Sequence, residues 1–193
     1  SWGSGSRVRN GTLNVTSTGS SLAPLNLVFG QAGWKRGLVT TTEITHATPA
    51  GFTVTVKDRG AGEDIAVQYL ARGVEVMLGG AQNHFDPAKR KDKRNLWADF
   101  ASAGYAVLRS RADLARAPLD RPWLGTFAGG HLPYSVDHAG NESLRTSVPT
   151  LPDMVERALA HLDRHEHFLL QVEGGRVDHA CHHNDAAAAL RDL

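Results

Sequence analysis

The sequence predicts an α/β protein with a mostly parallel central sheet that is covered by helices on both faces. Short apolar strands, rich in β-branched residues, alternate with stretches of helix-forming composition along the 193 residues. This alternation is typical of parallel sheets, because a helical crossover returns the chain to the same end of the sheet and covers one face. No internal repeat or linker divides the chain, so we expect residues 1–193 to belong to one domain.

The first elements alternate between loop, strand and helix. Residues 1–21 are rich in Ser, Gly, Thr and Asn, a composition that favours loops and turns. Residues 25–29 fit either a short helix or a strand, whereas the β-branched residues 37–43 predict a buried strand. Residues 45–51 predict a loop, and residues 63–72 have the composition of a helix.

The second half of the chain adds further strands and the clearest helix. In residues 150–164, Thr150 can cap the helix and Pro152 fits its first turn, while apolar residues recur on one face. An apolar strand at residues 168–172 follows, and a last helix is expected to begin near Asp178. The remaining predicted elements are strands at residues 74–78, 105–108 and 124–128 and a helix at residues 95–104.

Composition and charge argue against several classes of partner. The chain has 21 Lys and Arg against 20 Asp and Glu, which gives no support for binding nucleic acid or a membrane surface. No apolar run approaches the ~20 residues of a membrane-spanning helix. The single cysteine, Cys181, excludes an internal disulfide and is expected to be a small packing residue. Solvated positions are expected at His161, His165, His167 and the basic residues 89–94.

The segment at residues 172–183 carries the strongest chemical signal. Glu173 follows the apolar strand directly, two glycines then let the backbone turn, and Asp178 and His182 are spaced i, i+4. On a helix the latter two share one face, where a carboxylate and an imidazole suit zinc, while Glu173 suits magnesium. Such a pair is often only a solvated charge pair, but ligands gather at the carboxyl ends of strands in α/β sheets. The segment therefore predicts a multi-metal site.

The same segment resembles the metal-binding stretch of alkaline phosphatases, and other segments agree with that family in the same order. Residues 37–42, followed by His-Ala-Thr-Pro-Ala at residues 46–50, are similar to its strand and magnesium loop. Residues 73–80 resemble its glycine-ended strand, and residues 149–154 resemble the start of the helix before the metal-binding strand. The resemblance covers essentially the whole chain. It implies an alkaline-phosphatase-like α/β fold, of which the chain would form the central part of a single catalytic domain.

The resemblance implies two metal cofactors, zinc and magnesium. Glu173 and Thr48 match protein ligands of magnesium, and His46 matches a position that influences this ion through water. Asp178 and His182 match ligands of the first zinc ion. Hydroxyl and carboxylate oxygens suit magnesium, which retains water ligands, and paired zinc ions stabilise the attacking and leaving oxygens of phosphoryl transfer.

Two further residues match phosphate contacts of the family. Arg59, thirteen residues after His46, lies where the family has its phosphate-gripping arginine, and His179 matches a position that touches phosphate or its bound water. A guanidinium offers a planar fork to two phosphate oxygens and stays charged at alkaline pH. The family's nucleophilic serine, its early aspartate and its late zinc ligands have no match here; the serine is expected just before Ser1.

The resemblance implies metal-dependent hydrolysis of small-molecule phosphate monoesters through a phosphoserine intermediate. It also implies export to a periplasm or the cell exterior and the homodimer that is common in the family. Two other interpretations stay open. One is a related phosphodiesterase or sulfatase with the same metal core. The other is a noncatalytic metal-binding fragment, because several of the family's site residues have no match and the isolated chain is expected to be inactive.

Overall fold

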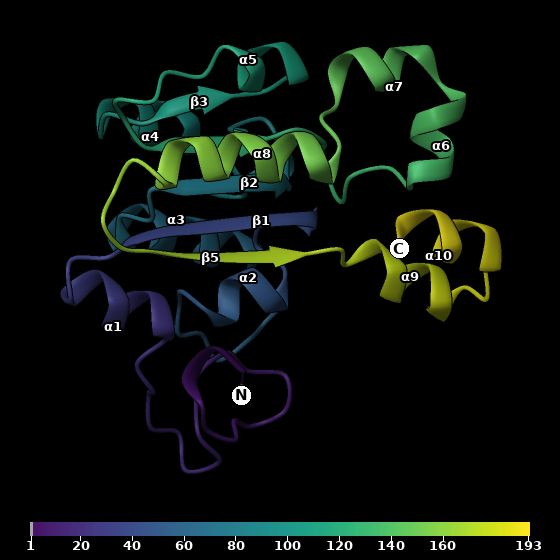
Figure 1. Ribbon diagram of the computed structural model, residues 1–193. Coiled ribbons are helices and arrows are strands. Elements are labelled where there is room, and N and C mark those ends of the chain that lie inside the picture. Colours follow the sequence, from purple (N-terminus) through teal and green to yellow (C-terminus); the bar gives the residue numbers. More distant parts are fainter. Residues whose placement is uncertain (1) are drawn as a thin grey trace.

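A computed structural model describes residues 2–193, so that Ser1, at the start of the predicted N-terminal loop, lies outside the described residues. It shows one sheet of five strands in which every neighbouring pair is parallel (Figure 1). The strands are β1 (Lys35–Glu43), β2 (Val76–Gly80), β3 (Ala106–Leu108), β4 (Trp123–Thr126) and β5 (Phe168–Glu173). They lie in the order β3-β4-β2-β1-β5. The predicted fold class is confirmed.

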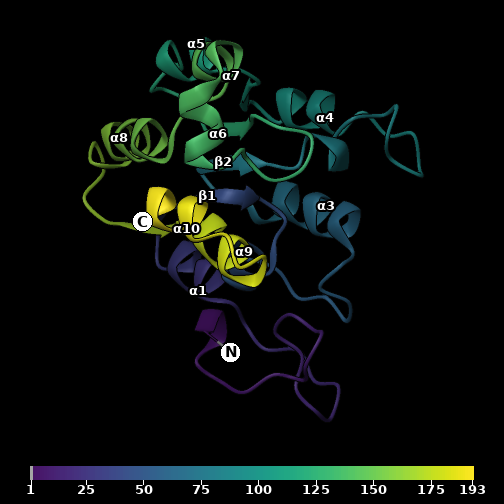
Figure 2. The same cartoon turned by 90° about the vertical axis from the view of Figure 1, so that its right-hand side faces the viewer.

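Helices cover both faces of the sheet. α3 (Gly62–Arg72) and α4 (Leu96–Ser102) lie on one face and α8 (Leu151–Leu162) on the other, as the view from the carboxyl ends of the strands shows (Figure 2). Successive strand residues therefore enter two separate cores, since Leu38 packs with α3 and its neighbour Val39 packs with α8. Burial on both faces explains why successive strand residues, such as Leu38 and Val39 of β1 or Met77 and Leu78 of β2, are both apolar.

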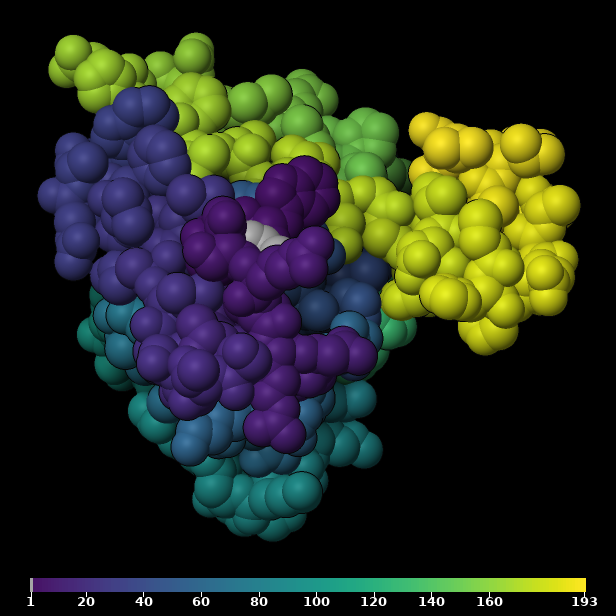
Figure 3. Space-filling view, turned by 90° about the horizontal axis from the view of Figure 1, so that it is seen from below, coloured from purple at the N-terminus to yellow at the C-terminus, as the bar shows by residue number. Residues whose placement is uncertain are grey.

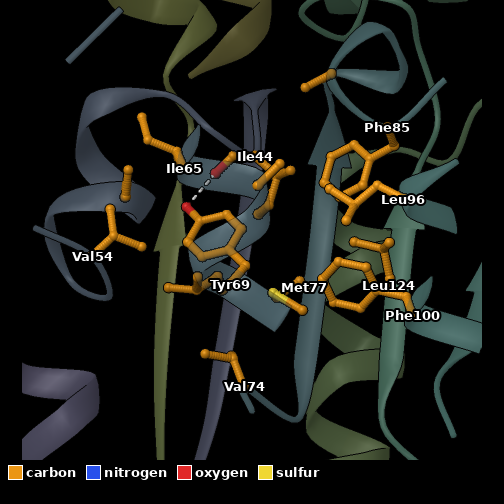
Figure 4. Packing of buried hydrophobic residues seen from close by; sticks show 14 of the residues in the cluster. Ile44, Val54, Ile65, Tyr69, Val74, Met77, Phe85, Leu96, Phe100 and Leu124 are labelled. Atoms are coloured by element: carbon orange, nitrogen blue, oxygen red, sulfur yellow. Dashed lines mark hydrogen bonds between the residues drawn. The ribbon is translucent and has the colours of Figure 1, made fainter. Parts of the chain in front are cut away.

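The core beside α3 anchors the end of β1. Tyr69 and Ile65 are fully buried there and pack with Met77 of β2 (Figure 4). The Tyr69 hydroxyl donates a hydrogen bond of 2.7 Å to the carbonyl oxygen of Ile44, just beyond β1. Burial raises the pKa of Tyr69 well above its ordinary value, so the phenol keeps the hydrogen that it donates. This bond holds the segment that leads from β1 to His46.

The helix predicted at residues 150–164 is confirmed as α8. The Thr150 side chain accepts the backbone N–H of Asp153, and the Asp153 carboxylate accepts the backbone N–H of Thr150, which is a capping box. Met154, Ala158 and Leu162 form its buried stripe. Burying Met154 or Leu162 stabilises the fold by about 1.5–3 kcal/mol relative to exposing it. The local sequence therefore defines both where α8 begins and which face it buries.

Some short elements lie outside the predictions. Residues 25–29, for which the sequence fits either a helix or a strand, belong to the helix α1 (Leu25–Gln31). α5 and α7 have only five and six residues, too few for a helical period to show in the sequence. Their N-cap residues, Ser110 and Asn141, nevertheless accept backbone N–H bonds with their side chains. The elements without a predicted counterpart are α5 (Arg111–Ala115), α6 (Ser135–Gly140), α7 (Glu142–Ser147) and the 3-10 turns η1 (Trp2–Ser4) and η2 (Gln82–His84).

The loop predicted at residues 45–51 is wrong, because α2 (Ala47–Gly51) occupies most of that segment. Pro49 lies in the first turn of α2, where its missing N–H costs no helical hydrogen bond. The proline that favours a loop in the sequence is therefore compatible with a helix start.

The single helix expected near Asp178 is also wrong, since the structure has α9 (Arg176–His182) and α10 (Ala186–Asp192). Between them Asn184 adopts a left-handed backbone with φ of 55°, which ends α9. The two helices project beyond the sheet as a lobe, shown in yellow in Figures 1 and 3. Within residues 2–193, every helix is too short or too polar to span a bilayer.

The N-terminal residues form the predicted loop, which covers part of the face seen in Figure 3 in purple, and η1 at its start contacts α2. Asn14 adopts a positive φ of 54°, and its side-chain amide donates to the carbonyl oxygens of Gly51 and Val54, each at 2.7 Å. Gly3 approaches α2 so closely that a Cβ at this position would lie 2.0 Å from the carbonyl oxygen of Gly51. The loop is therefore a packed part of the fold.

Two burial predictions on single residues are wrong. His161, expected to be solvated, is 3% exposed, because its Nε2 bonds to the carbonyl of Arg121 and its ring packs edge-on against Trp123. Cys181, expected to pack, is exposed on α9. His165 and His167 are exposed, as predicted.

The basic residues 89–94 are solvated except for Arg90, which is 1% exposed. Its guanidinium donates to the carboxylate of Asp92 and to the carbonyl oxygen of His84. These acceptors replace water around the buried charge. Arg90 therefore holds the loop before α4 together, a role that its neighbours in the sequence do not indicate.

Candidate active site

The candidate site lies where β1 and β5 end. β1 ends at Glu43 and β5 at Glu173, and the two strands are parallel neighbours, so both carboxylates lie at the same end of the sheet. His46 is the N-cap of α2 directly beyond β1, and α9 begins shortly after β5. Ligands commonly bind at the carboxyl ends of strands in α/β sheets.

Glu173 is oriented by two threonines of β1. Its Oε2 accepts hydrogen bonds from the hydroxyls of Thr40, at 2.7 Å, and Thr42, at 3.3 Å. The turn that follows needs glycine, since a Cβ at Gly175 would lie 2.4 Å from Cγ2 of Thr42 and 3.0 Å from Cδ of Glu173. The predicted role of these glycines in backbone freedom is wrong, because Gly175 has an ordinary helical backbone with φ of −70°, and close packing is what requires glycine there. The carboxylate of Glu173 is held in one orientation.

Asp178 and His182 lie together on the exposed face of α9. Asp178 Oδ1 is 3.6 Å from His182 Nε2, and the two side chains are 72% and 76% exposed. Their donor set fits half of a tetrahedral zinc shell, which usually has four ligands. Within residues 2–193, no three side chains of His, Cys, Asp or Glu are arranged to hold a metal ion. The pair thus offers two ligands, and a complete shell needs further donors.

Arg59 and Thr48 line one cavity of about 350 Å³ between α2 and the N-terminal loop. Arg59 is exposed, and its backbone N–H donates to the carbonyl oxygen of Gly11 at 2.9 Å, which fixes the arginine beside that loop. A second arginine, Arg9, lines the same cavity. Two guanidinium groups and a threonine hydroxyl make this cavity suitable for an anion.

Three imidazoles meet at the carboxyl end of the sheet. The ring of His131 lies 4.4 Å from that of His179 and 5.5 Å from that of His46, measured between centroids, and His46 lies 5.5 Å from His179. Burial lowers the pKa of His131 to about 4, although the charge of Glu43 opposes this shift. His131 is therefore neutral at physiological pH. His46 Nδ1 is buried without a hydrogen-bond partner.

His179 is held by Arg176. The guanidinium donates to His179 Nδ1 at 2.9 Å and lies 3.7 Å from the ring centroid of Tyr134. Burial lowers the pKa of His179, and the charge of Arg176 lowers it further. Both effects disfavour the imidazolium form.

Glu43 pairs with His84 on the other side of the cluster. Glu43 Oε2 lies 3.5 Å from His84 Nε2. The hydrogen bond with His84 lowers the pKa of Glu43, against the opposing effect of burial. The site therefore combines carboxylates, neutral imidazoles and guanidinium groups, a mixture suited to binding an oxyanion beside metal ions.

Comparison with known proteins decides the family. All of residues 1–193 match the family model described as Alkaline phosphatase. The chain belongs to the alkaline phosphatase family. Alkaline phosphatase 3 of Bacillus subtilis strain 168 is 35% identical over 196 residues, which cover 98% of this chain and 40% of that protein.

Solved alkaline phosphatases share the fold. The crystal structure of Thermus thermophilus alkaline phosphatase matches with a TM-score of 0.90 at 46% identity, over 96% of this chain and 39% of that one. A mutant of the enzyme from the Antarctic bacterium TAB5, described with Mg bound in the M3 site, matches in fold with a TM-score of 0.80 at 24% identity, over 96% and 51% of the chains. The chain thus spans about two fifths of the length of the Bacillus and Thermus relatives.

For this alkaline phosphatase family member, the structure arranges the sequence-predicted residues in separate groups. Asp178 pairs with His182, and His46 faces His179. Arg59 and Thr48 form another group, because they line the same cavity. Glu173 stands apart from these groups and is hydrogen-bonded to β1.

Several residues of the site escaped the sequence-based prediction. Two of these residues have a signal in the sequence. Glu43 lies at the end of a strand, and His131 follows directly after Gly129 and Gly130. The segment before His131 packs closely on the end of β2, where glycine is needed, because a Cβ at Gly80 would lie 1.9 Å from the carbonyl oxygen of Gly130. The unpredicted residues are Arg9, Glu43, His84, His131, Tyr134 and Arg176.

Proposed function

We propose that this chain contributes to the catalytic site of a metal-dependent phosphomonoesterase that acts through a phosphoserine intermediate. The observation that carries the proposal is the match of residues 1–193 to the alkaline phosphatase family, in a fold that brings Asp178 and His182 together at the carboxyl end of β5. The substrates would be small-molecule phosphate monoesters. The nucleophilic serine is not among the residues assigned here.

Asp178 and His182 would hold zinc, and Glu173 and Thr48 would hold magnesium, with His46 acting on it through water. The magnesium described in the TAB5 mutant supports a metal-dependent reaction. A bound divalent cation would supply Lewis acidity and lower the pKa of a bound water. The Thr40 and Thr42 hydroxyls hold Glu173 against β1 through one carboxylate oxygen, which leaves the other oxygen for a ligand.

Arg59 would bind two non-bridging oxygens of the phosphate group. Its exposed guanidinium lines a cavity together with Thr48, so a phosphate bound there would lie beside the proposed magnesium ligand. A planar guanidinium can bind two oxygens at once and keeps its charge at alkaline pH. His179, neutral and held by Arg176, would contact the phosphate or its bound water.

The assembled protein is proposed to be exported to a periplasm or the cell exterior and to form a homodimer. Two other functions predict different results. A related phosphodiesterase or sulfatase would hydrolyse other esters at the same metal core, and a noncatalytic fragment would bind metal without turnover. The Asp178–His182 pair is common to all three, so metal binding alone does not distinguish them.

The test is hydrolysis of a chromogenic phosphate monoester at alkaline pH by the assembled enzyme that contains this chain, since the isolated chain is expected to be inactive. Zinc and magnesium are supplied, and a chelated sample is the control. A matched phosphodiester and a sulfate ester are assayed in parallel. Chelator-sensitive turnover of the monoester, well above that of the other two esters, is expected. Turnover chiefly of the diester or the sulfate would contradict the proposal, and so would stoichiometric zinc binding without hydrolysis.

A further inference from the structure

The three imidazoles His46, His131 and His179 come from three different segments and meet within 4.4–5.5 Å between ring centroids. Such a group could bind a metal ion, relay protons or donate hydrogen bonds to a ligand. Which role a neutral imidazole can take depends on which ring nitrogen carries the hydrogen. The hydrogen bonds to Nδ1 of His131 and His179 decide this for two of the three rings.

The backbone of Glu43 sets the tautomer of His131. The N–H of Glu43 donates to His131 Nδ1 at 2.9 Å. Because an amide N–H can only donate, Nδ1 must offer its lone pair, and the ring hydrogen of the neutral form lies on Nε2. The next residue, Leu132, donates its N–H to the carbonyl oxygen of Thr41 at 3.0 Å, so the segment that carries His131 is bound to β1 at two successive positions.

Arg176 sets the same tautomer in His179. A guanidinium has donors and no acceptor, so His179 Nδ1, 2.9 Å from it, must accept, and the hydrogen lies on Nε2. Arg176 is itself fixed, since its backbone N–H donates to the hydroxyl of Thr41 at 3.2 Å and its guanidinium stacks on Tyr134. Both neighbouring rings therefore present Nε2–H groups.

We propose that His131 is a further phosphate-binding residue, which with His179 presents a pair of neutral Nε2–H donors to the oxygens of a substrate's phosphate group. This inference rests on the proposed phosphatase function. To bind a metal ion through Nε2, either ring would have to carry its hydrogen on Nδ1. That hydrogen would then face the donor hydrogen of the Glu43 amide or of the Arg176 guanidinium, which is unfavourable. The two N–H donors thus match a tetrahedral oxyanion better than a cation.

Two substitutions of His131 distinguish the effect of its Nε2–H donor from the effect of its Nδ1 acceptor, which anchors the segment to Glu43. His131→Asn keeps an acceptor near the position of Nδ1 for the Glu43 N–H but removes the distal donor. His131→Gln places an amide N–H₂ near the position of Nε2. The exposed His165 provides a matched control in His165→Asn. Binding of inorganic phosphate is measured by calorimetry on the metal-loaded, assembled enzyme that contains this chain, and KM and kcat of the same enzyme are measured for a phosphate monoester.

We expect His131→Asn to weaken phosphate binding by about tenfold, the loss typical of one hydrogen bond to a charged group, and to raise KM more than it lowers kcat. His131→Gln should restore most of the affinity, and His165→Asn should match the wild type. Unchanged phosphate affinity in His131→Asn would overturn the proposal. An equal loss in His131→Asn and His131→Gln would do the same, because it would show that the ring and not its donor matters.

The tautomer is measured separately, by long-range ¹H–¹⁵N correlation spectra of the metal-free protein. Hydrogen on Nε2 of both His131 and His179 is expected, and hydrogen on Nδ1 of His131 would overturn the inference whether or not the protein is a phosphatase. Phosphate binding that depends on His131 without ester hydrolysis would support the inference and contradict the proposed function. Absence of both binding and hydrolysis would contradict both.

Discussion

Tyr69 of α3 donates its hydroxyl hydrogen to the carbonyl oxygen of Ile44 at 2.7 Å, and this bond connects the core to the segment that carries His46 (Figure 4). Both side chains are fully buried. The carbonyl of Ile44 lies two residues before the N-cap of α2, so the position of His46 depends on a side chain from another helix.

Tyr69→Phe is expected to destabilise the fold by about 1–3 kcal/mol, because it leaves the buried carbonyl of Ile44 without its donor. Tyr105→Phe is the matched control, since Tyr105 makes an equivalent buried bond of 2.9 Å to the carbonyl oxygen of Val74. Urea denaturation gives the free energy of unfolding of each variant. Only Tyr69→Phe should shift the imidazole NMR signals of His46; equal shifts in both variants would show that Tyr69 has no special relation to the site.

Gly175→Ala is expected to destabilise the protein by about 1–3 kcal/mol, because the added Cβ would lie 2.4 Å from Thr42 Cγ2 and would displace Glu173 or β1. Gly140→Ala, where a Cβ would meet no atom within 4 Å, should change stability by no more than about 0.5 kcal/mol. Thermal unfolding of both variants tests this difference. Equal stability of the two would mean that the turn after β5 relaxes freely.

Asp178→Asn is expected to weaken zinc binding by at least about tenfold, since the amide is a poorer ligand than the carboxylate. The control is Glu166→Gln, because Glu166 and His167 form another exposed acid–imidazole pair, also with an N–O distance of 3.6 Å. Zinc affinity is measured by competition with a chromogenic chelator. Zinc affinity that falls equally in both variants, or in neither, would count against a zinc site at Asp178 and His182.

Arg59→Ala is expected to weaken inhibition by inorganic phosphate by about tenfold or more while leaving the metal content unchanged, because it removes a two-pronged donor but no metal ligand. Lys57→Ala removes an exposed positive charge two positions away and serves as the control. Inhibition constants and elemental analysis give the two readouts. Loss of metal in Arg59→Ala, or unchanged inhibition, would contradict the assignment.

His161 is expected to make stability fall at mildly acidic pH. Burial lowers the pKa of His161 below its ordinary 6.5, although its bond to the carbonyl of Arg121 opposes the shift. Its neutral form therefore stabilises the fold fully above pH 6.5, and this contribution is lost as the pH falls from there through the folded-state pKa. The free energy of unfolding of the wild type should fall more steeply between pH 7.5 and 5 than that of His161→Gln; parallel curves would show that His161 does not titrate on unfolding.

Local signals in the sequence predict most of the architecture. The strand at residues 37–43 and the helix at residues 150–164 are visible because their apolar patterns and the Thr150 cap are properties of neighbouring residues. Short elements such as α5 give no such pattern. α2 is missed because Pro49 favours a loop except in the first turn of a helix.

For the candidate site, the sequence by itself determined the family resemblance and the spacing of Asp178 and His182, since both depend only on the order of residues. Only the tertiary structure decided that His131 lies beside His179 and that the backbone N–H of Glu43 holds its ring. These contacts join segments that are far apart in the chain. They arise from the parallel pairing of the strands, which gathers the loops at one end of the sheet and leaves no local trace in any one of them.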